Sequence, residues 1–283
     1  MQQVKITNNM LREVAGEVPS TREAAMNPEW LSYALAHLSG GAKVATVELT
    51  NVVQAMAAKV LIAVTFEGAP DKVYRLCIKG FLDHDIPDVV KDPTTLRESD
   101  FYAQIAPQIT MRTPPCVALI TDRDAGQCVF IMADMIADGA HFYDALEPLT
   151  VPQAEESLDQ LARLHARPEL LQGRDWIPCR LDDILTSTYI TWDETQALMH
   201  GERRADLPDD TLDANLLKQS LEKLAVLGKE LPETILHGDV HPGNLYRTAE
   251  GRFGFTDWQL LHRGHWSLEV AYHINSVRPV EVS

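Results

Sequence analysis

The stretch that decides the fold runs from residue 234 to residue 259 and reads TILHGDVHPGNLYRTAEGRFGFTDWQ. Its apolar beginning, residues 234–236, is short enough to predict a buried β-strand. Pro242 and Gly243 then mark the following segment as a loop. The sequence therefore predicts a strand that leads directly into a loop rich in polar side chains.

A β-hairpin is predicted directly after this loop, with strands at residues 245–247 and 252–256 around a turn that ends in Gly251. Asp239 and Asn244 lie in the loop, and Asp257 stands at the end of the second hairpin strand. We therefore expect the side chains of these three residues to meet in the folded protein.

Phosphoryl transfer is the chemistry that needs such a set of groups. One carboxylate orients the attacking hydroxyl and accepts its proton, while an amide oxygen and a second carboxylate hold Mg²⁺ against the nucleotide phosphates. In the kinase catalytic loop, His-x-Asp is followed by an Asn five residues after the Asp. His237, Asp239 and Asn244 have this spacing.

The pattern His-Gly-Asp-x-His-x-x-Asn at residues 237–244, followed by Asp257-Trp-Gln, resembles the aminoglycoside phosphotransferase and choline kinase-like family. The resemblance implies an α+β, bilobal protein-kinase-like fold and a small-molecule kinase. It implies ATP and Mg²⁺ as cofactors and a small-molecule hydroxyl as the acceptor. In this scheme Asp239 is the catalytic base, and Asn244 and Asp257 are the metal ligands.

Three other interpretations of the loop stay open. Asp and Asn in a turn often only cap backbone groups. His237, Asp239 and His241 alternate along the chain and could instead bind the metal of a hydrolase, although this leaves Lys79 and Glu98, described below, without a role. The protein could also bind a nucleotide without catalysing transfer.

Length and composition favour a globular protein of one large or two modest domains, with 283 residues and 45% hydrophobic residues. The four cysteines are far apart, which fits a reducing compartment. No secretory leader and no apolar run of roughly 20 residues is present, so we expect a cytoplasmic protein without a membrane span. The net charge of −16 argues against a nucleic-acid partner; it could favour a cationic substrate, or simply keep the protein soluble.

Upstream of the loop, residues 42–135 show the alternating pattern of a small lobe built on a five-stranded antiparallel sheet plus one helix. The predicted strands span residues 44–50, 58–66, 72–79, 116–122 and 128–134. Residues 1–41 are expected to form an N-terminal helical extension, with a helix that begins at Asn27 and Pro28. Residues 136–283 are expected to form the large catalytic lobe.

Lys79 closes the third predicted strand, and the next helix is expected to start at Asp92-Pro93 or at Thr95. Glu98 shares the apolar face of this helix with Phe101, Tyr102 and Ile105. A carboxylate that faces inward must find a partner. The kinase scheme supplies one, because a strand lysine that holds the nucleotide phosphates is steadied by a helix glutamate. We therefore expect Lys79 and Glu98 to pair in the cofactor site, unless Glu98 only reaches solvent at the edge of the helix.

The resemblance also implies that the hinge, at Asp134 and Met135, contacts the adenine through its backbone.

Two features depart from the pattern. The loop at residues 51–58 has no glycine, whereas protein kinases cover the phosphates with a glycine-rich loop. The chain also ends soon after Asp257, whereas the family usually continues through helices that help to form the acceptor pocket. We therefore expect either a chain that is truncated at its C-terminus or one whose terminal helices are replaced.

The rest of the large lobe carries weaker signals. Residues 174–210 look irregular and acidic, either lining a substrate pocket or serving as a solvated connector. A helix is expected over residues 154–165, with His165 in a structural role near its end.

Overall fold

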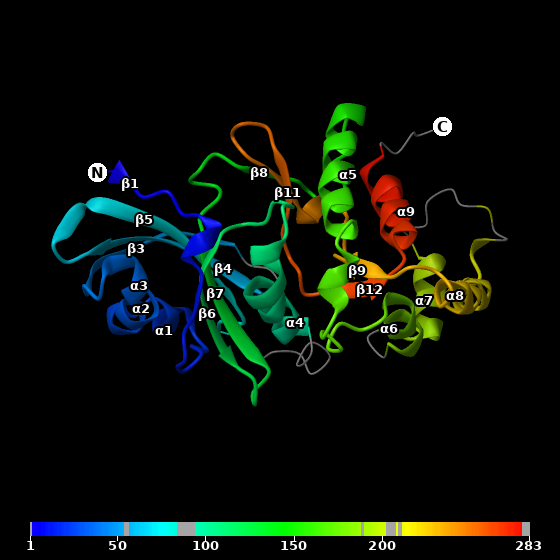
Figure 1. The fold of residues 1–283 in the computed structure, drawn as a ribbon, viewed down its shortest axis with the longest axis horizontal. Helices are drawn as coiled ribbons and strands as arrows, with labels where there is room; N and C mark the ends of the chain where they lie inside the picture. Colours follow the sequence, from blue (N-terminus) through cyan, green and yellow to red (C-terminus); the bar gives the residue numbers. More distant parts are fainter. Residues whose placement is uncertain are drawn as a thin grey trace.

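The computed structural model describes residues 2–53, 57–83, 94–187, 190–201, 208 and 211–278. The small lobe, with most of its strands, lies on one side of the molecule in Figure 1, and the mainly helical large lobe lies on the other. One core cluster lies within the small lobe, and the second joins apolar side chains of both lobes, such as Phe101 and Phe130 with Leu161 and Trp258. The predicted α+β, bilobal kinase-like architecture is confirmed, whereas the lobe boundary after residue 135 stays a prediction.

The small lobe is built on an antiparallel sheet in the order β6-β7-β5-β4-β3. These strands are β3 Val44–Val53, β4 Ala58–Phe66, β5 Ala69–Gly80, β6 Cys116–Asp122 and β7 Gln127–Ala133. The side chains of strand β4, which lies between β5 and β3, are almost all buried on both faces, which explains its dense run of apolar and β-branched residues. The five predicted strands are therefore confirmed.

The N-terminal segment contributes to this sheet as well as packing on it. Strand β1, Gln2–Gln3, pairs in parallel with β5, and strand β2, Arg12–Glu13, pairs in parallel with β6. The helices of the segment are α1 Arg22–Ala25, α2 Pro28–Ala34 and α3 Ala36–Ser39, and their buried faces join the core under the sheet. The prediction of a helical extension is thus incomplete, because strands of two residues are too short to show a period in the sequence.

Helix α4, Thr94–Asp100, lies between the sheet and the large lobe (Figure 1). The predicted start at Asp92-Pro93 falls outside the described residues. The helix does not continue with α-helical spacing, because Phe101–Ile105 forms a π-helical turn. Such turns often occur at functional sites. Glu98, Phe101, Tyr102 and Ile105 are nevertheless all buried, as their spacing predicts.

The large lobe holds the predicted strand and hairpin. Strand β9, Thr234–Leu236, pairs with β12, His262–Gly264. Strands β10, Leu245–Arg247, and β11, Phe253–Phe255, form the hairpin, and β8, His141–Phe142, joins its edge. The loop between β9 and β10 is therefore held between two small sheets.

Helices surround these sheets (Figure 1). They are α5 Val151–His165, α6 Arg180–Thr186, α7 Trp192–Met199, α8 Ala214–Gly228 and α9 Trp266–Val277. The prediction that residues 174–210 are irregular is wrong where α6 and α7 form. These helices are one to two turns long and bury few side chains, so they leave almost no apolar period in the sequence.

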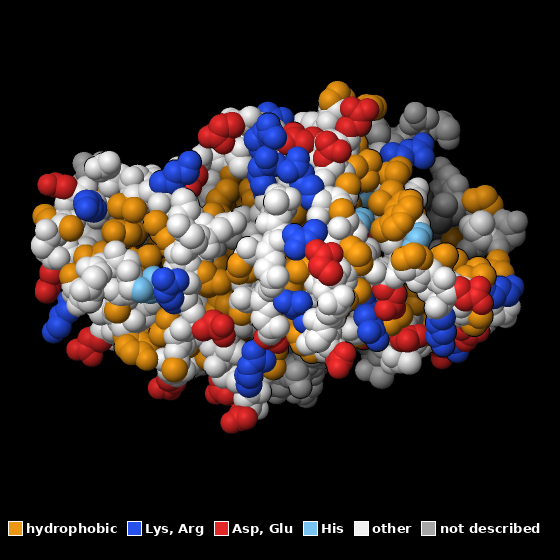
Figure 2. Space-filling view, in the orientation of Figure 1, with side chains coloured by type: hydrophobic (Ala, Val, Ile, Leu, Met, Phe, Trp, Pro, Cys, Tyr) orange, Lys and Arg blue, Asp and Glu red, His pale blue; other side chains and the backbone are white. Residues whose placement is uncertain are grey.

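The surface charge is not gathered into one acidic region on the face shown in Figure 2, where acidic and basic side chains are interspersed. Basic side chains collect near β11 and α5, and apolar ones are exposed around α9. None of the helices in the described part of the chain has the length and apolar character needed to cross a bilayer.

Candidate active site

The loop after β9 is fixed by His237, which is fully buried. Its Nδ1 accepts a hydrogen bond from the backbone N–H of Asp239 at 3.2 Å, and its Nε2–H donates to the carbonyl of Thr256 at 3.0 Å. Burial lowers the pKa of His237, which keeps the ring neutral. Both ring nitrogens are therefore engaged with the backbone, so His237 braces the loop.

Gly238 occupies a position that only glycine fits. Its φ is +87°, and a Cβ atom placed there would lie 1.8 Å from the carbonyl oxygen of Leu260. Its N–H donates to Oε1 of Glu269 at 2.6 Å. The backbone of the loop therefore passes close to Leu260, which only glycine allows. A hydrogen bond to Glu269 joins the loop to helix α9.

Asp239 is held by donors on both of its carboxylate oxygens. The amide Nδ2 of Asn244 donates to Oδ2 at 3.0 Å and to the Asp239 backbone carbonyl at 2.9 Å. The hydroxyl of Tyr272 donates to Oδ1 at 3.0 Å, and Nε2 of His241 lies 3.5 Å from Oδ2. Burial raises the pKa of Asp239, but the hydrogen bonds and charges of these partners outweigh it and leave the pKa below its usual value. Asp239 is therefore ionised at neutral pH.

The amide oxygen of Asn244 is not engaged by Asp239. Because Nδ2 faces Asp239, the oxygen Oδ1 points elsewhere, and no described residue donates a hydrogen bond to it. The backbone carbonyl of Asn244 accepts from the N–H of Thr256 at 2.9 Å. This bond joins the loop directly to the residue before Asp257.

Asp257 has a φ of +67°, in the left-handed region that side chains rarely adopt. Backbone strain of this kind costs on the order of 1 kcal/mol and tends to occur at functional sites. Oδ1 of Asp257 lies 3.2 Å from Nζ of Lys79. Burial raises the pKa of Asp257, but the positive charges of Lys79 and Lys59 outweigh it, so the pKa lies below its usual value.

Lys79 and Glu98 form the predicted ion pair. Nζ of Lys79 donates to both carboxylate oxygens of Glu98, at 2.9 and 2.8 Å, and both side chains are buried. Burial lowers the pKa of Lys79, but the adjacent carboxylates of Asp257 and Glu98 outweigh it and raise the pKa above its usual value. The N–H of Trp258 also donates to Glu98, at 3.4 Å. Lys79 is therefore a buried cation shared by a carboxylate from each lobe.

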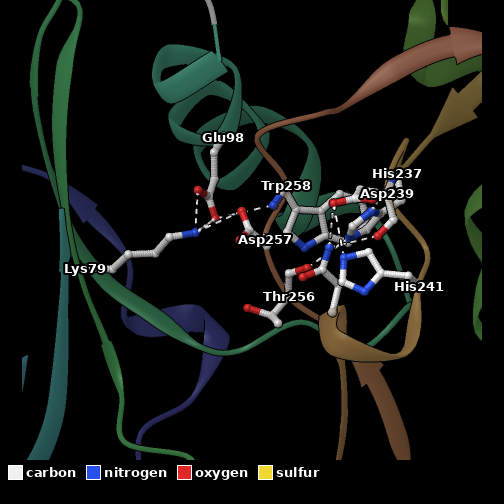
Figure 3. Close-up of polar contacts among 9 residues, drawn as sticks. Lys79, Glu98, His237, Asp239, His241, Thr256, Asp257 and Trp258 are labelled. Carbon is white, nitrogen blue, oxygen red and sulfur yellow. Dashed lines mark hydrogen bonds and ion pairs between the residues drawn. The ribbon is translucent and has the colours of Figure 1, made fainter. Parts of the chain in front are cut away.

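Figure 3 shows how these groups converge. Lys79 extends from the small lobe, Glu98 descends from α4, and Asp257 meets both from the large lobe. Asp239 and His241 lie on the far side of Asp257 and Trp258. The predicted catalytic, metal-binding and lysine side chains thus gather in one place, although they are up to 178 positions apart in sequence.

A cavity of about 210 Å³ opens beside Lys79 and includes the predicted hinge residues Asp134 and Met135. Its other lining residues come from both lobes and are mainly apolar: Val53, Lys59, Leu61, Cys77, Pro114, Met132, Ala133, Ile136, Phe142, Gly243 and Thr256. A partly apolar cleft next to charged groups is the usual form of a ligand site. The glycine-free loop at residues 51–58 is described only in part, so its predicted effect on phosphate coverage stays a prediction.

The two hinge residues differ in what they offer to a ligand. The carboxylate of Asp134 accepts from the N–H groups of Ile136 and Ala137, at 3.1 and 3.0 Å, and its own N–H donates to the carbonyl of Arg75. The N–H of Met135 has no acceptor among the described residues. Asp134 therefore shapes the turn, and Met135 is the one of the two with a free backbone donor.

Helix α9 contributes three residues that sequence reasoning missed. Glu269 is buried and accepts from Gly238 N–H and from His165, whose Nε2 lies 2.7 Å away. His273 contacts the carbonyl of Val240 at 2.7 Å, and Tyr272 holds Asp239. Glu269 and His273 are four residues apart on the buried face of α9. Two polar residues at helical spacing were the available signal, which a search for apolar periods passes over.

The hydrolase interpretation finds little support. Both nitrogens of His237 are engaged by the backbone, and Nδ1 of His241 accepts from Gly243 N–H at 3.0 Å. Among the described residues, no group of three or more His, Cys, Asp and Glu side chains is arranged to hold a metal ion. Asp257 Oδ1 contacts Lys79, whereas Asn244 Oδ1 and Asp257 Oδ2 accept no hydrogen bond from the described residues. Carboxylate and amide oxygens of this kind fit Mg²⁺.

Several solved structures are similar to this chain at low sequence identity. Choline kinase LicA from Streptococcus pneumoniae matches with 12% identity and a TM-score of 0.48, over 88% of this chain and 74% of the other. Macrolide 2′-phosphotransferase MphH from Brachybacterium faecium matches with 16% identity and a TM-score of 0.45, over 86% and 76%. The ethanolamine kinase of Plasmodium vivax matches with 15% identity and a TM-score of 0.44, over 88% and 66%.

At this level of similarity, these structures add no argument about activity. No curated protein sequence matches the chain significantly. The family comparison is decisive, because the model of the phosphotransferase enzyme family matches residues 76–282, a range that contains every site residue predicted above. The chain therefore belongs to the phosphotransferase enzyme family.

Proposed function

We propose that this protein transfers the γ-phosphoryl group of ATP to a hydroxyl group of a small molecule, with Mg²⁺ as the metal. The observation that carries the proposal is the position of Lys79, whose Nζ lies within hydrogen-bond distance of Glu98 and Asp257 together. A lysine buried between carboxylates from two lobes is the arrangement that phosphoryl-transfer enzymes use to hold phosphates.

The nucleotide is proposed to bind with its base in the cavity beside the hinge. The apolar lining accommodates a flat aromatic ring, and the free N–H of Met135 can donate a hydrogen bond to a ring nitrogen. Asp134 supports this segment by capping its turn. The phosphates then extend toward Lys79, at the end of the same cavity.

Asn244 and Asp257 would hold Mg²⁺ through their oxygen atoms. Bound there, the metal supplies positive charge that offsets the negative charge on the transferring phosphoryl group. The strained backbone of Asp257 is consistent with a side chain held for this purpose rather than for stability.

Asp239 is proposed to act as the base. The acceptor oxygen forms a bond to the γ-phosphorus, the bond from that phosphorus to the β–γ bridging oxygen breaks, and the products are ADP and a phosphate monoester. The hydroxyl proton passes to the Asp239 carboxylate, which is ionised and partly exposed. A positioned base of this kind contributes about 10²- to 10⁴-fold to the rate.

A thermal-shift experiment with ATP, with and without Mg²⁺, tests the nucleotide part of the proposal. Ligand at 100 times its Kd should raise the free energy of unfolding by about 2.7 kcal/mol, and the increase should depend on Mg²⁺. The absence of any shift at saturating ATP would remove both the kinase and the nucleotide-binding interpretations.

Measurement of ADP release across a panel of small hydroxyl compounds tests the transfer step. Aminoglycosides, choline-like amines, sugars and lipid-like alcohols form the panel, with the matching compounds that lack the hydroxyl as controls. A compound that stimulates ADP release only when it carries the hydroxyl identifies the acceptor class. Mg²⁺-dependent ATP binding without stimulated release by any of them would favour a nucleotide-binding protein without catalysis.

A cytoplasmic location is proposed from the cysteines. Cys77, Cys116, Cys128 and Cys179 are all free thiols. Burial raises the pKa of Cys116 and of Cys128, which keeps both thiols protonated and unreactive. Free, inert thiols are typical of proteins in a reducing compartment.

A further inference from the structure

Helix α4 presents four consecutive polar side chains that are all buried, with exposed fractions of 4, 3, 2 and 7% for Arg97, Glu98, Ser99 and Asp100. Successive side chains on an α-helix point about 100° apart, so the four face different neighbours. Glu98 contacts Lys79, Ser99 contacts Thr121 at 2.9 Å, and Asp100 pairs with Arg123 at 2.5 Å. These three contacts fix the helix to the small lobe.

Arg97 points its side chain into the large lobe. Its NH1 lies 3.2 Å from Nε2 of His262, 3.8 Å from Oδ2 of Asp183 and 3.5 Å from the carbonyl of Leu261. His262 is fully buried, and its Nε2 lies 2.6 Å from the same Asp183 oxygen. The three side chains come from helix α4, strand β12 and helix α6, so they join three elements at one point.

Asp183 is the anion that Arg97 and His262 share in this cluster. Its Oδ2 faces both the Arg97 guanidinium and the His262 ring. The hydrogen bond to His262 and the positive charges of Arg97 and Arg180 hold the pKa of Asp183 below its usual value. A buried guanidinium needs a nearby anion to offset the loss of its hydration, and Asp183 supplies this charge from the large lobe.

We propose that Arg97, His262 and Asp183 form a positioning network that holds helix α4 against the large lobe and thereby keeps Glu98 on Lys79. The inference rests on the proposed function, because it assigns these residues a part in placing Lys79 for the nucleotide. Arg97 directly precedes Glu98, so any movement of Arg97 along the helix axis also moves Glu98. On the other side of Glu98, Phe101 stacks on Trp258 with ring centroids 3.7 Å apart, so the helix is held on both sides of the glutamate.

The Asp183→Asn variant tests this network, with binding of AMP-PNP in the presence of Mg²⁺ measured by calorimetry. Asn keeps the shape of the side chain, which is 43% exposed, and removes its charge. We expect the Kd for AMP-PNP to rise about tenfold, as for the loss of one charged hydrogen bond. Asp182→Asn is the matched control, because this exposed neighbour is no part of the network, and it should leave the Kd within about twofold.

A double-mutant cycle separates positioning from a general loss of structure. If Asp183 acts through Glu98, then adding Asp183→Asn to Glu98→Gln should raise the Kd by less than about twofold. Equal losses in both backgrounds, or an effect no larger than that of Asp182→Asn, would overturn the inference. Arg97→Lys, which keeps the charge and loses the planar fork, should repeat the pattern, with melting temperatures recorded for every variant. Failure of the unmodified protein to bind Mg²⁺ and AMP-PNP would instead refute the proposed function.

Discussion

Two regions hold Asp239, and they differ in how their residues reach it. The catalytic loop supplies Asn244, five positions away, through two short hydrogen bonds. Helix α9 supplies Tyr272, 33 positions away, through one. Asn244 lies near Asp239 because both belong to the same short loop. Tyr272 reaches Asp239 only because helix α9 packs against that loop. A carboxylate in a sequence motif can therefore be positioned in part by a side chain, here Tyr272, that lies outside the motif.

The largest effect is expected for Asp239 itself. Replacement of Asp239 by Asn removes the proposed base and should lower kcat by about 10²-fold or more. The Kd for nucleotide should change little, because Asp239 is not among the residues that line the cavity proposed for the adenine. Steady-state kinetics together with nucleotide titration check both parts. A variant that keeps full turnover would show that another group accepts the proton.

The second effect concerns Gly238, where the loop passes close to the backbone of Leu260. Gly238→Ala places a Cβ within 1.8 Å of a backbone oxygen at a φ of +87°, and should lower the free energy of unfolding by about 3 kcal/mol. Gly68→Ala is the matched control, because its φ is +79° and nothing lies within 4 Å. It should cost only the backbone strain, about 1 kcal/mol. Chemical denaturation of both variants measures the difference, and equal losses would mean that the close approach to Leu260 is not limiting.

The third effect tests the metal side of the loop. Asp257→Asn removes the charge of the proposed Mg²⁺ ligand while keeping its shape, and should weaken Mg²⁺-dependent AMP-PNP binding by about tenfold or more. Binding without Mg²⁺ should change much less. Titrations with and without Mg²⁺ make this distinction, and an equal loss in the two conditions would place Asp257 outside the metal site.

The smallest effect is expected for Tyr272 of helix α9. Tyr272→Phe removes the hydroxyl that donates to Asp239 and stabilises its charged form, so the pKa of Asp239 should rise. Because the base must be ionised to work, the acidic limb of the kcat profile should move to higher pH. Tyr33→Phe, which loses a hydroxyl bonded to the Ala15 carbonyl far from the site, should leave the profile unchanged. A profile that does not move in Tyr272→Phe would mean that α9 supports the loop without tuning the base.

The same contrast explains how much the sequence could predict. The five sheet strands, the hairpin and the Lys79–Glu98 pair follow from periods and from a charge on an apolar face, which are local features. Strands β1 and β2 form only because the sheet edge is available to them. Helices α6 and α7 lack an apolar period. Asp183 and Tyr272 act through partners that are distant in sequence, so their spacing does not identify them.

The most direct test of the central claim is the position of the metal in a complex with AMP-PNP and Mn²⁺, located by anomalous diffraction. We expect a single metal peak within about 2.5 Å of Asn244 Oδ1 and the Asp257 carboxylate, with Lys79 contacting the phosphates. A metal bound instead between Asp239 and His241, or phosphates that lie away from Lys79, would contradict it.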